Sequence, residues 1–148
     1  MPGVVPELSP ESEHRIRGHF ATVAFNLFLG AEITLLASGR CELAVQFREE
    51  LAQQDGYFHG GVIATLADSG AGHAALTLMG AGHRALTVEF KVNFLAPARG
   101  ERLLMRSRVI KHGGTLTIAQ SDAFTFRNGE KTHCATALVT YMGFIPRG

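Results

Sequence analysis

A single carboxylate interrupts an otherwise uncharged stretch of this chain. Between Asp55 and Arg84 the only charged side chain is Asp68, and it lies in a run of small and apolar residues from 62 to 76. Burial of a carboxylate is costly unless the group is paired or hydrogen-bonded, and no cation lies near Asp68 in sequence. We therefore predict that Asp68 is functional. The structural alternative is a buried aspartate that accepts hydrogen bonds from the backbone or from Thr65 or Ser69.

The same segment predicts one long, buried helix. Residues 60–79 contain no proline and are followed by a Gly-Ala-Gly sequence, which is a typical helix stop. The helix is apolar nearly all the way round, so other elements must enclose it. Its small residues would let a sheet approach closely: Gly70, Ala71, Gly72, Ala74 and Ala75.

About six β-strands are expected around this helix. A short polar helix over 9–20 and a polar loop over 48–57 are also expected. Apolar alternation and turn residues predict strands over 29–36, 40–47, 85–94, 101–111, 115–127 and 131–141. The Asn128-Gly129 pair predicts a hairpin, so the chain should end in an antiparallel meander. The expected fold class is α+β, an antiparallel sheet curled around one helix. Its uncovered edges and helix flank predict a partner subunit.

Composition limits the partners and the location of the protein. The 148 residues suit one domain overall, with a lead-in and short helix at 1–24 and the main domain at 25–148. A net charge of +1 provides no general attraction to nucleic acid. The sequence shows no membrane span or export signal, and Cys41 and Cys134 lack the spacing of a disulfide framework. We expect a cytoplasmic protein, and the spacing of its histidines and carboxylates predicts no metal site.

Two segments carry a family resemblance. The sequence HGGVIATLAD at residues 59–68 resembles the motif of PaaI-like, phenylacetyl-CoA-pathway hotdog thioesterases, in which His-Gly-Gly opens a central helix that bears an acidic residue. The sequence LTVEFKVNFLAPA at residues 86–98 is similar to the following strand and its proline-containing turn. The resemblance covers about residues 25–141. It implies hydrolysis of an acyl-CoA thioester by a homodimer or dimer of dimers, without metal and with no cofactor apart from the CoA of the substrate.

Thioester hydrolysis requires a polarised carbonyl group and an activated nucleophile. The N–H of Gly60, with that of Gly61 beside it, lies at the predicted start of the helix, where amides are unpaired and the helix dipole is positive. Alternatively, the two glycines only ease the turn into the helix. Asp68 would act as a general base or as a nucleophile that forms a mixed anhydride.

The spacing of these two groups predicts a shared site. Gly60 and Asp68 are eight residues apart, which is about 12 Å along a helix. One thioester carbonyl needs both groups within about 3 to 4 Å. We therefore expect antiparallel helices of two subunits, with the start of one helix facing Asp68 of the other.

Three other residues are candidates for the reaction. The resemblance places Gln53 where relatives carry an amide that holds water or thioester, more often Asn; simple solvation is the alternative. It places Thr87 where relatives carry a hydroxyl near the acidic residue; an ordinary strand threonine is the alternative. His59 could act as a base, but a histidine that begins a helix more often braces the backbone, which is the role we predict.

Substrate contacts are expected from two further groups. Basic residues at strand ends could bind CoA phosphates or simply be solvated: Arg84, Arg99, Lys111 and His112. Candidates for the acyl pocket, which could equally be ordinary core, are Phe25, Asn26, Leu27 and Phe58.

Two other functions are alternatives to thioester hydrolysis. A hotdog enoyl-CoA hydratase or dehydratase needs a histidine and a carboxylate that converge on one carbon. His73 lies about 140° from Asp68 around the helix, so it is not expected to converge. A non-catalytic acyl-CoA-binding module would usually carry an added DNA-binding or basic domain, and the chain offers no room for one.

Overall fold

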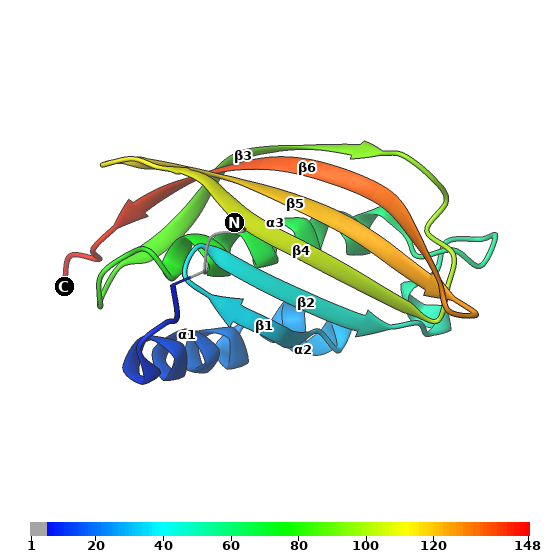
Figure 1. Cartoon of the computed structure of the whole chain (residues 1–148), viewed down its shortest axis with the longest axis horizontal. Coiled ribbons are helices and arrows are strands. Elements are labelled where there is room, and N and C mark those ends of the chain that lie inside the picture. Colours follow the sequence, from blue (N-terminus) through cyan, green and yellow to red (C-terminus); the bar gives the residue numbers. More distant parts are fainter. Residues whose placement is uncertain (1–5) are drawn as a thin grey trace.

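A curved antiparallel sheet wraps around the central helix of the chain. The computed structural model describes residues 6–148, so the expected lead-in lies partly outside the described residues. Helix α3 (Gly60–Leu76) lies in the concave face of the sheet, and the shorter helices α1 (Pro10–Thr22) and α2 (Ala24–Leu29) lie beside it (Figure 1). This is the predicted hotdog arrangement of an α+β protein.

The sheet has six strands in the order β1-β2-β4-β5-β6-β3. Their bounds are β1 Glu32–Ala37, β2 Arg40–Gln46, β3 Arg84–Phe94, β4 Arg102–His112, β5 Leu116–Arg127 and β6 Glu130–Phe144. Strands β4, β5 and β6 form the predicted meander. Strand β3 pairs with β6 on the far side, so it is an edge strand although it precedes β4 in sequence. At the predicted β5–β6 turn, Asn128 and Gly129 have φ of 50° and 80°, as expected for a tight hairpin.

Helix α3 is three residues shorter than predicted. His59 caps its start, since the His59 Nδ1 accepts the N–H of Gly61 at 2.8 Å. Beyond Leu76 the chain tightens: the N–H groups of Leu78 and Met79 bond to carbonyls three residues earlier, rather than four. Such a tightened turn is a common way to satisfy the last carbonyls of a helix.

The N-terminal region differs most from its prediction. Residues expected to lead straight into a strand over 29–36 form α2, and β1 begins only at Glu32. Gly30, in the left-handed conformation at φ 71°, ends this short helix. Inside α2, Asn26 is 1% exposed and its Nδ2 donates to Ser69 Oγ of α3 at 2.8 Å. The helix therefore depends on a tertiary contact that local apolar alternation does not reveal.

Small residues of α3 let the sheet approach closely, as predicted. The described core includes Ala67, Ala71, Ala74 and Ala75. Ser121 Oγ of β5 donates to the Ala67 carbonyl at 2.8 Å, and Ser107 Oγ of β4 lies 2.7 Å from Ser121 Oγ. Helix and sheet are thus joined by buried hydroxyl groups as well as by apolar contact.

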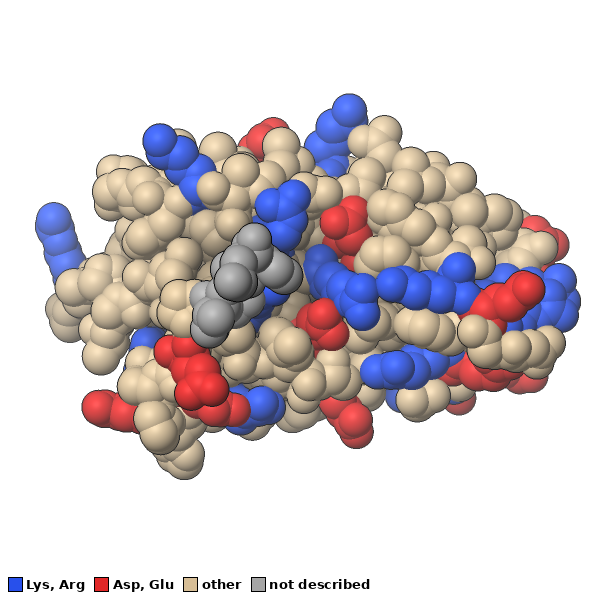
Figure 2. All heavy atoms as spheres, viewed as in Figure 1, with Lys and Arg blue, Asp and Glu red and all other residues tan. Residues whose placement is uncertain are grey.

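The outer face of the sheet carries charges of both signs. Figure 2 shows Lys and Arg side chains beside Asp and Glu side chains on this face. Arg106 pairs with Glu42 at 3.0 Å, and His133 lies 3.0 Å from Asp122. Within residues 6–148, no helix is long and apolar enough to cross a membrane.

Gly70 provides a test of the close approach. A Cβ atom at Gly70 would lie 2.5 Å from Ser107 Oγ, so Gly70→Ala should lower the free energy of unfolding by about 1–3 kcal/mol through overpacking. Urea unfolding measures the change. The control is Gly18→Ala, at an exposed position of α1 where a Cβ meets nothing within 4 Å. This change should keep or raise the free energy of unfolding. Equal stability of Gly70→Ala and wild type would contradict the packing described.

Candidate active site

Asp68 is held by hydroxyl groups from two neighbouring strands. Its Oδ1 accepts from Thr87 Oγ1 of β3 at 2.7 Å and from the Tyr141 hydroxyl of β6 at 2.8 Å. The Tyr141 hydroxyl also donates to the main-chain carbonyl of Asp68. Within residues 6–148, no donor bonds to the second oxygen, Oδ2. One oxygen of Asp68 is fixed, and the other is left for a ligand or water.

Strand register explains why these two hydroxyls converge. Thr87 and Tyr141 are paired across β3 and β6, so their side chains share the face toward α3. A bulge follows Thr87, between Thr87 and Glu89. Burial, and then the charge of Asp68, raises the pKa of Tyr141, which keeps its hydroxyl protonated as a donor. Gly72 leaves room for the ring, because a Cβ there would lie 3.2 Å from it.

Asp68 opens into a cavity of about 280 Å³. The predicted acyl-pocket candidates Phe25 and Asn26 line this cavity, whereas Leu27 does not. Its full lining is His19, Val23, Phe25, Asn26, Thr65, Asp68, Ser69, Gly72, His73, Leu76, Ala85, Thr87 and Tyr141. The cavity thus runs along one face of α3, between α1 and α2 on one side and β3 and β6 on the other.

A pair of hydrogen-bonded histidines lines this cavity. His73 Nδ1 lies 2.7 Å from the Ser69 carbonyl, and His73 Nε2 lies 3.1 Å from His19 Nδ1. Because a carbonyl only accepts, His73 is protonated at Nδ1 and accepts from His19 at Nε2. Burial lowers the pKa of His73 to about 4, so this ring is neutral near neutral pH. His73 lines the same cavity as Asp68, which the helical wheel did not suggest, but both of its ring nitrogens are engaged elsewhere.

Gly60 lies in a different cavity, of about 570 Å³. Within residues 6–148 the structure has no acceptor for the Gly60 N–H, whereas the Gly61 N–H is bonded to His59. The Phe94 ring lies over Gly60, 3.2 Å from where a Cβ would be. The cavity is lined by Gln53, Tyr57, Phe58, Gly60, Ile63, Phe94, Leu95, Ala96, Pro97 and Ala98. An anionic or polarised oxygen could therefore reach the Gly60 amide but not that of Gly61.

The predicted amide, Gln53, organises the loop beside Gly60. Its Oε1 accepts the N–H of Asp55, and that of Tyr57 at 3.3 Å. Gln53 also lines the Gly60 cavity together with Phe58, so these two candidates lie with Gly60 and not with Asp68.

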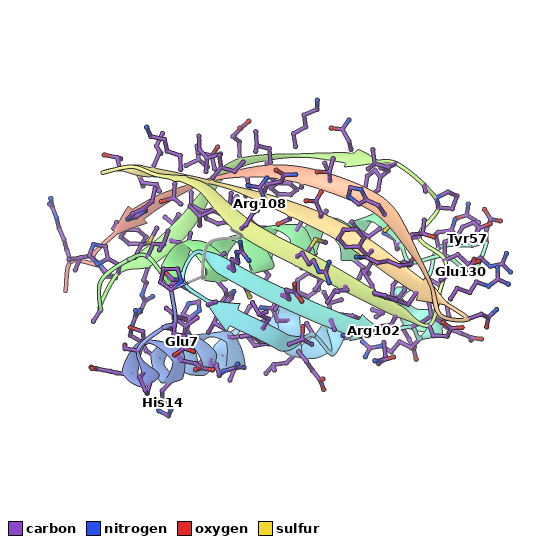
Figure 3. All side chains as sticks on the ribbon, in the orientation of Figure 1. Glu7, His14, Tyr57, Arg102, Arg108 and Glu130 are labelled. Carbon is purple, nitrogen blue, oxygen red and sulfur yellow. The ribbon has the colours of Figure 1, made fainter. Side chains whose placement is uncertain are left out.

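The two cavities share no residue within one chain. Tyr57, which lines the Gly60 cavity, projects at the end of the molecule opposite the C-terminus (Figure 3). The Asp68 cavity extends toward the other end of α3, as far as Leu76. One chain therefore presents the amide and the carboxylate to different spaces.

The predicted phosphate contacts are dispersed. Arg99 lies over the Tyr57 ring at 6.0 Å. His112 bonds to Thr117 at 2.8 Å, and Lys111 is exposed beside it at the end of β4. Arg84 lies outside the Asp68 cavity and lines a separate hollow together with Arg15 and His83. One chain does not gather these four residues into a single groove.

Sequence reasoning missed Tyr141 and His19, whereas it named Gly72 as a small residue that lets the sheet approach the helix. A signal for Tyr141 existed, because the inward positions of β6 before it are the small or apolar Ala135, Ala137 and Val139. A tyrosine at the end of such a row needs a partner for its hydroxyl.

Within residues 6–148, no three His, Cys, Asp or Glu side chains are grouped as metal ligands.

Comparison with known proteins identifies several thioesterases among the relatives of this chain. Residues 55–132 match the family model of the thioesterase superfamily. A thioesterase family protein from Silicibacter pomeroyi has a crystal structure that matches with a TM-score of 0.90 and 44% identity, over 91% of this chain and 99% of that chain. The medium/long-chain acyl-CoA thioesterase YigI of Escherichia coli is 27% identical over 133 residues, 80% of this chain and 84% of its own. The Escherichia coli PaaI protein, from the phenylacetic acid degradation operon, shares the fold at 17% identity, with a TM-score of 0.82 over 93% of this chain and 96% of that chain.

His73 should make the fold sensitive to acid. Its ordinary pKa of 6.5 falls to about 4 on folding, so below about pH 6.5 the unfolded chain binds a proton that the folded chain excludes. Between about pH 7 and pH 5, wild type should lose about 2 kcal/mol more stability than His73→Gln. Urea unfolding at the two pH values measures this difference. The control His14→Gln, on a side chain that projects from α1 away from the sheet (Figure 3), should keep the wild-type loss. Equal pH dependence in wild type and His73→Gln would contradict the assignment.

Proposed function

Because this chain belongs to the thioesterase superfamily and is a thioester hydrolase, we propose that it hydrolyses acyl-CoA thioesters with a medium-chain or aromatic acyl group. The observation that carries the proposal is the half-buried Asp68, which lines a cavity and whose Oδ1 is bonded by two hydroxyls while Oδ2 accepts from no donor within residues 6–148. The name of the relative YigI, a medium/long-chain acyl-CoA thioesterase, supports the substrate class. Val23, Phe25, Leu76 and Ala85 give the cavity apolar walls for an acyl chain.

Asp68 would activate the attack on the thioester. As a general base, Oδ2 takes a proton from water while the water oxygen bonds to the carbonyl carbon; the C–S bond then breaks, the protonated Asp68 returns that proton to sulfur, and CoA leaves as the thiol. As a nucleophile, Oδ2 itself bonds to that carbon and the C–S bond breaks, so that CoA leaves as the thiolate. Water then hydrolyses the anhydride to the free acid and Asp68, and one of its protons goes to the CoA thiolate. In both cases Thr87 and Tyr141 hold the other oxygen, so the carboxylate stays oriented during the reaction.

Gly60 would polarise the thioester carbonyl. Its N–H has no acceptor within residues 6–148 and lies at the positive end of a 17-residue helix. Gln53 would keep the adjoining loop in place, and His59 would cap the helix rather than transfer a proton.

A second copy of the chain would complete the site. β3 is an edge strand with exposed apolar side chains: Leu86, Val88, Phe90 and Phe94. Such an edge is normally covered. A two-fold axis beside β3 would pair two such edges and set two α3 helices antiparallel, which brings Gly60 of one copy toward Asp68 of the other. We propose a homodimer as the catalytic unit, within the dimer of dimers that the resemblance implies.

The proposed reaction requires water but no cofactor or metal. We also propose a cytoplasmic location. Cys41 and Cys134 are buried free thiols, and burial raises their pKa to about 12 and about 11. Free thiols suit a reducing compartment. Hydratase chemistry has less support, because the hydrogen bonds of His73 direct both ring nitrogens away from Asp68.

Replacement of Asp68 tests the proposal directly. Asp68→Ala and Asp68→Asn should lower kcat by about 10²–10⁴-fold in a free-thiol assay with an acyl-CoA panel, because the base or nucleophile is lost. Tyr141→Phe should lower kcat less, because it removes one of two donors. Circular dichroism and thermal melting check folding. Unchanged turnover in folded Asp68→Ala would reject the role of Asp68.

Mixed dimers test whether two copies share the site. Gly60→Pro removes the N–H at the first helical position, where proline is favoured, and should lower kcat by about 10²–10³-fold. Gly60→Ala, which keeps the N–H and adds a Cβ, is its matched control. Unfolding and refolding Asp68→Ala with Gly60→Pro should restore about a quarter of wild-type activity, since half the dimers would carry one intact site. No recovery, despite proven exchange of subunits, would contradict a shared site.

A further inference from the structure

A second hollow adjoins the far end of the Asp68 cavity. It has a volume of about 350 Å³ and lies where α1, the loop after α3 and the end of β6 come together (Figure 1). It is lined by Arg15, Ile16, His19, Leu76, Gly82, His83, Arg84, Ile145 and Pro146. Three segments far apart in sequence therefore build it.

The hollow has two positively charged side chains and no acidic side chain to neutralise them. Arg15 and Arg84 line it, and none of its lining residues is acidic. In the part of the chain that the structure describes, neither arginine forms an ion pair, although Arg17, two residues beyond Arg15, pairs with Glu13. Arg15 Nη2 makes one contact, to the Met79 carbonyl at 3.4 Å, which leaves most of its donors unused. Two unpaired guanidinium groups beside one hollow are suited to an anion.

His19 links this hollow to the catalytic cavity. Both His19 and Leu76 line the two spaces. Partial burial, and then the positive charges of Arg84 and Arg15, lower the pKa of His19, which lines the hollow together with both arginines. His19 is therefore neutral near neutral pH, and the arginines supply the positive charge.

The distance along α3 suits the length of an acyl chain. Leu76 is eight residues beyond Asp68, or about 12 Å along the helix. Between them the cavity is lined by Gly72 and Ala85 and by the uncharged rings of His73 and Tyr141. The hollow adds the apolar side chains of Ile16 and Ile145. A path that carries no charge between Asp68 and the two cations suits a chain that is uncharged along its length and anionic at its end.

We propose that this hollow is a subsite for the terminal carboxylate of an ω-carboxyacyl group, so that the preferred substrates are CoA thioesters of medium-chain dicarboxylic acids. The inference rests on the proposed function, because it takes Asp68 as the position of the thioester. The acyl group is the part that extends past Asp68 toward Leu76, since CoA would leave on the side of the partner's amide. Arg84 would then bind the acyl end, and not a CoA phosphate as the sequence suggested.

Matched pairs of substrates test the proposal. Suberoyl-CoA and octanoyl-CoA differ only in the terminal carboxylate, as do sebacoyl-CoA and decanoyl-CoA. Hydrogen bonds to charged groups predict that wild type will have a kcat/KM about ten- to hundred-fold higher for the dicarboxylic member. Arg84→Met and Arg15→Met should reduce this preference at least several-fold, chiefly by lowering kcat/KM for the dicarboxylic member. Arg84→Lys should retain part of it.

Controls separate the possible failures. Arg17→Met, on the same helix but paired with Glu13 away from the hollow, should keep the full preference. If wild type hydrolyses octanoyl-CoA as well as suberoyl-CoA, the subsite is wrong while the proposed function stands. If Arg84→Met raises KM equally for acetyl-CoA, octanoyl-CoA and suberoyl-CoA, the hollow binds a CoA phosphate and the subsite is also wrong. If no acyl-CoA is hydrolysed, the proposed function fails, and the inference with it.

Discussion

The hydrogen bonds to Asp68 are the interaction on which the candidate site depends. A carboxylate on an enclosed helix is tolerated only if polar groups reach it. Here Thr87 and Tyr141 do so from adjacent strands. Both hydroxyls bond to the same oxygen, so the stabilisation of the charge and the freedom of the other oxygen arise from one arrangement. The carboxylate is therefore held in one orientation while its second oxygen, Oδ2, can still bond to water or to a ligand.

That arrangement requires a close fit between helix and sheet. Gly72 gives the Tyr141 ring room beside the helix, and Gly70 allows Ser107 to lie against the backbone. A helix built from larger residues would stand farther from the sheet, and the strand hydroxyls would not reach Asp68. The glycine and alanine content of α3 is therefore a condition for the hydrogen bonds to Asp68 as well as for the packing.

The two ends of α3 differ in character. Its start offers the unpaired Gly60 amide in a cavity made largely of loop residues, whereas the space beyond Asp68 ends at Arg15 and Arg84. In the proposed two-fold dimer the start of each helix would approach the middle of the other. A substrate lying across the interface would then meet an amide at its carbonyl oxygen, a carboxylate at its carbonyl carbon and guanidinium groups at its far end.

Elements that depend on short sequence patterns are predictable from the chain alone. Helix α3, the hairpin at Asn128-Gly129 and most strand positions follow from periodicity and turn residues, and Asp68 was conspicuous because charge is absent around it. Tertiary structure alone decided what depends on residues far apart in the chain. Helix α2 forms where Asn26 meets Ser69, Tyr141 is paired with Thr87 by strand register, and Arg15 joins Arg84 because α1 packs beside the end of α3. Backbone preferences act over a few residues, but a site is assembled by packing and register, and these are settled only when the whole sheet closes around the helix.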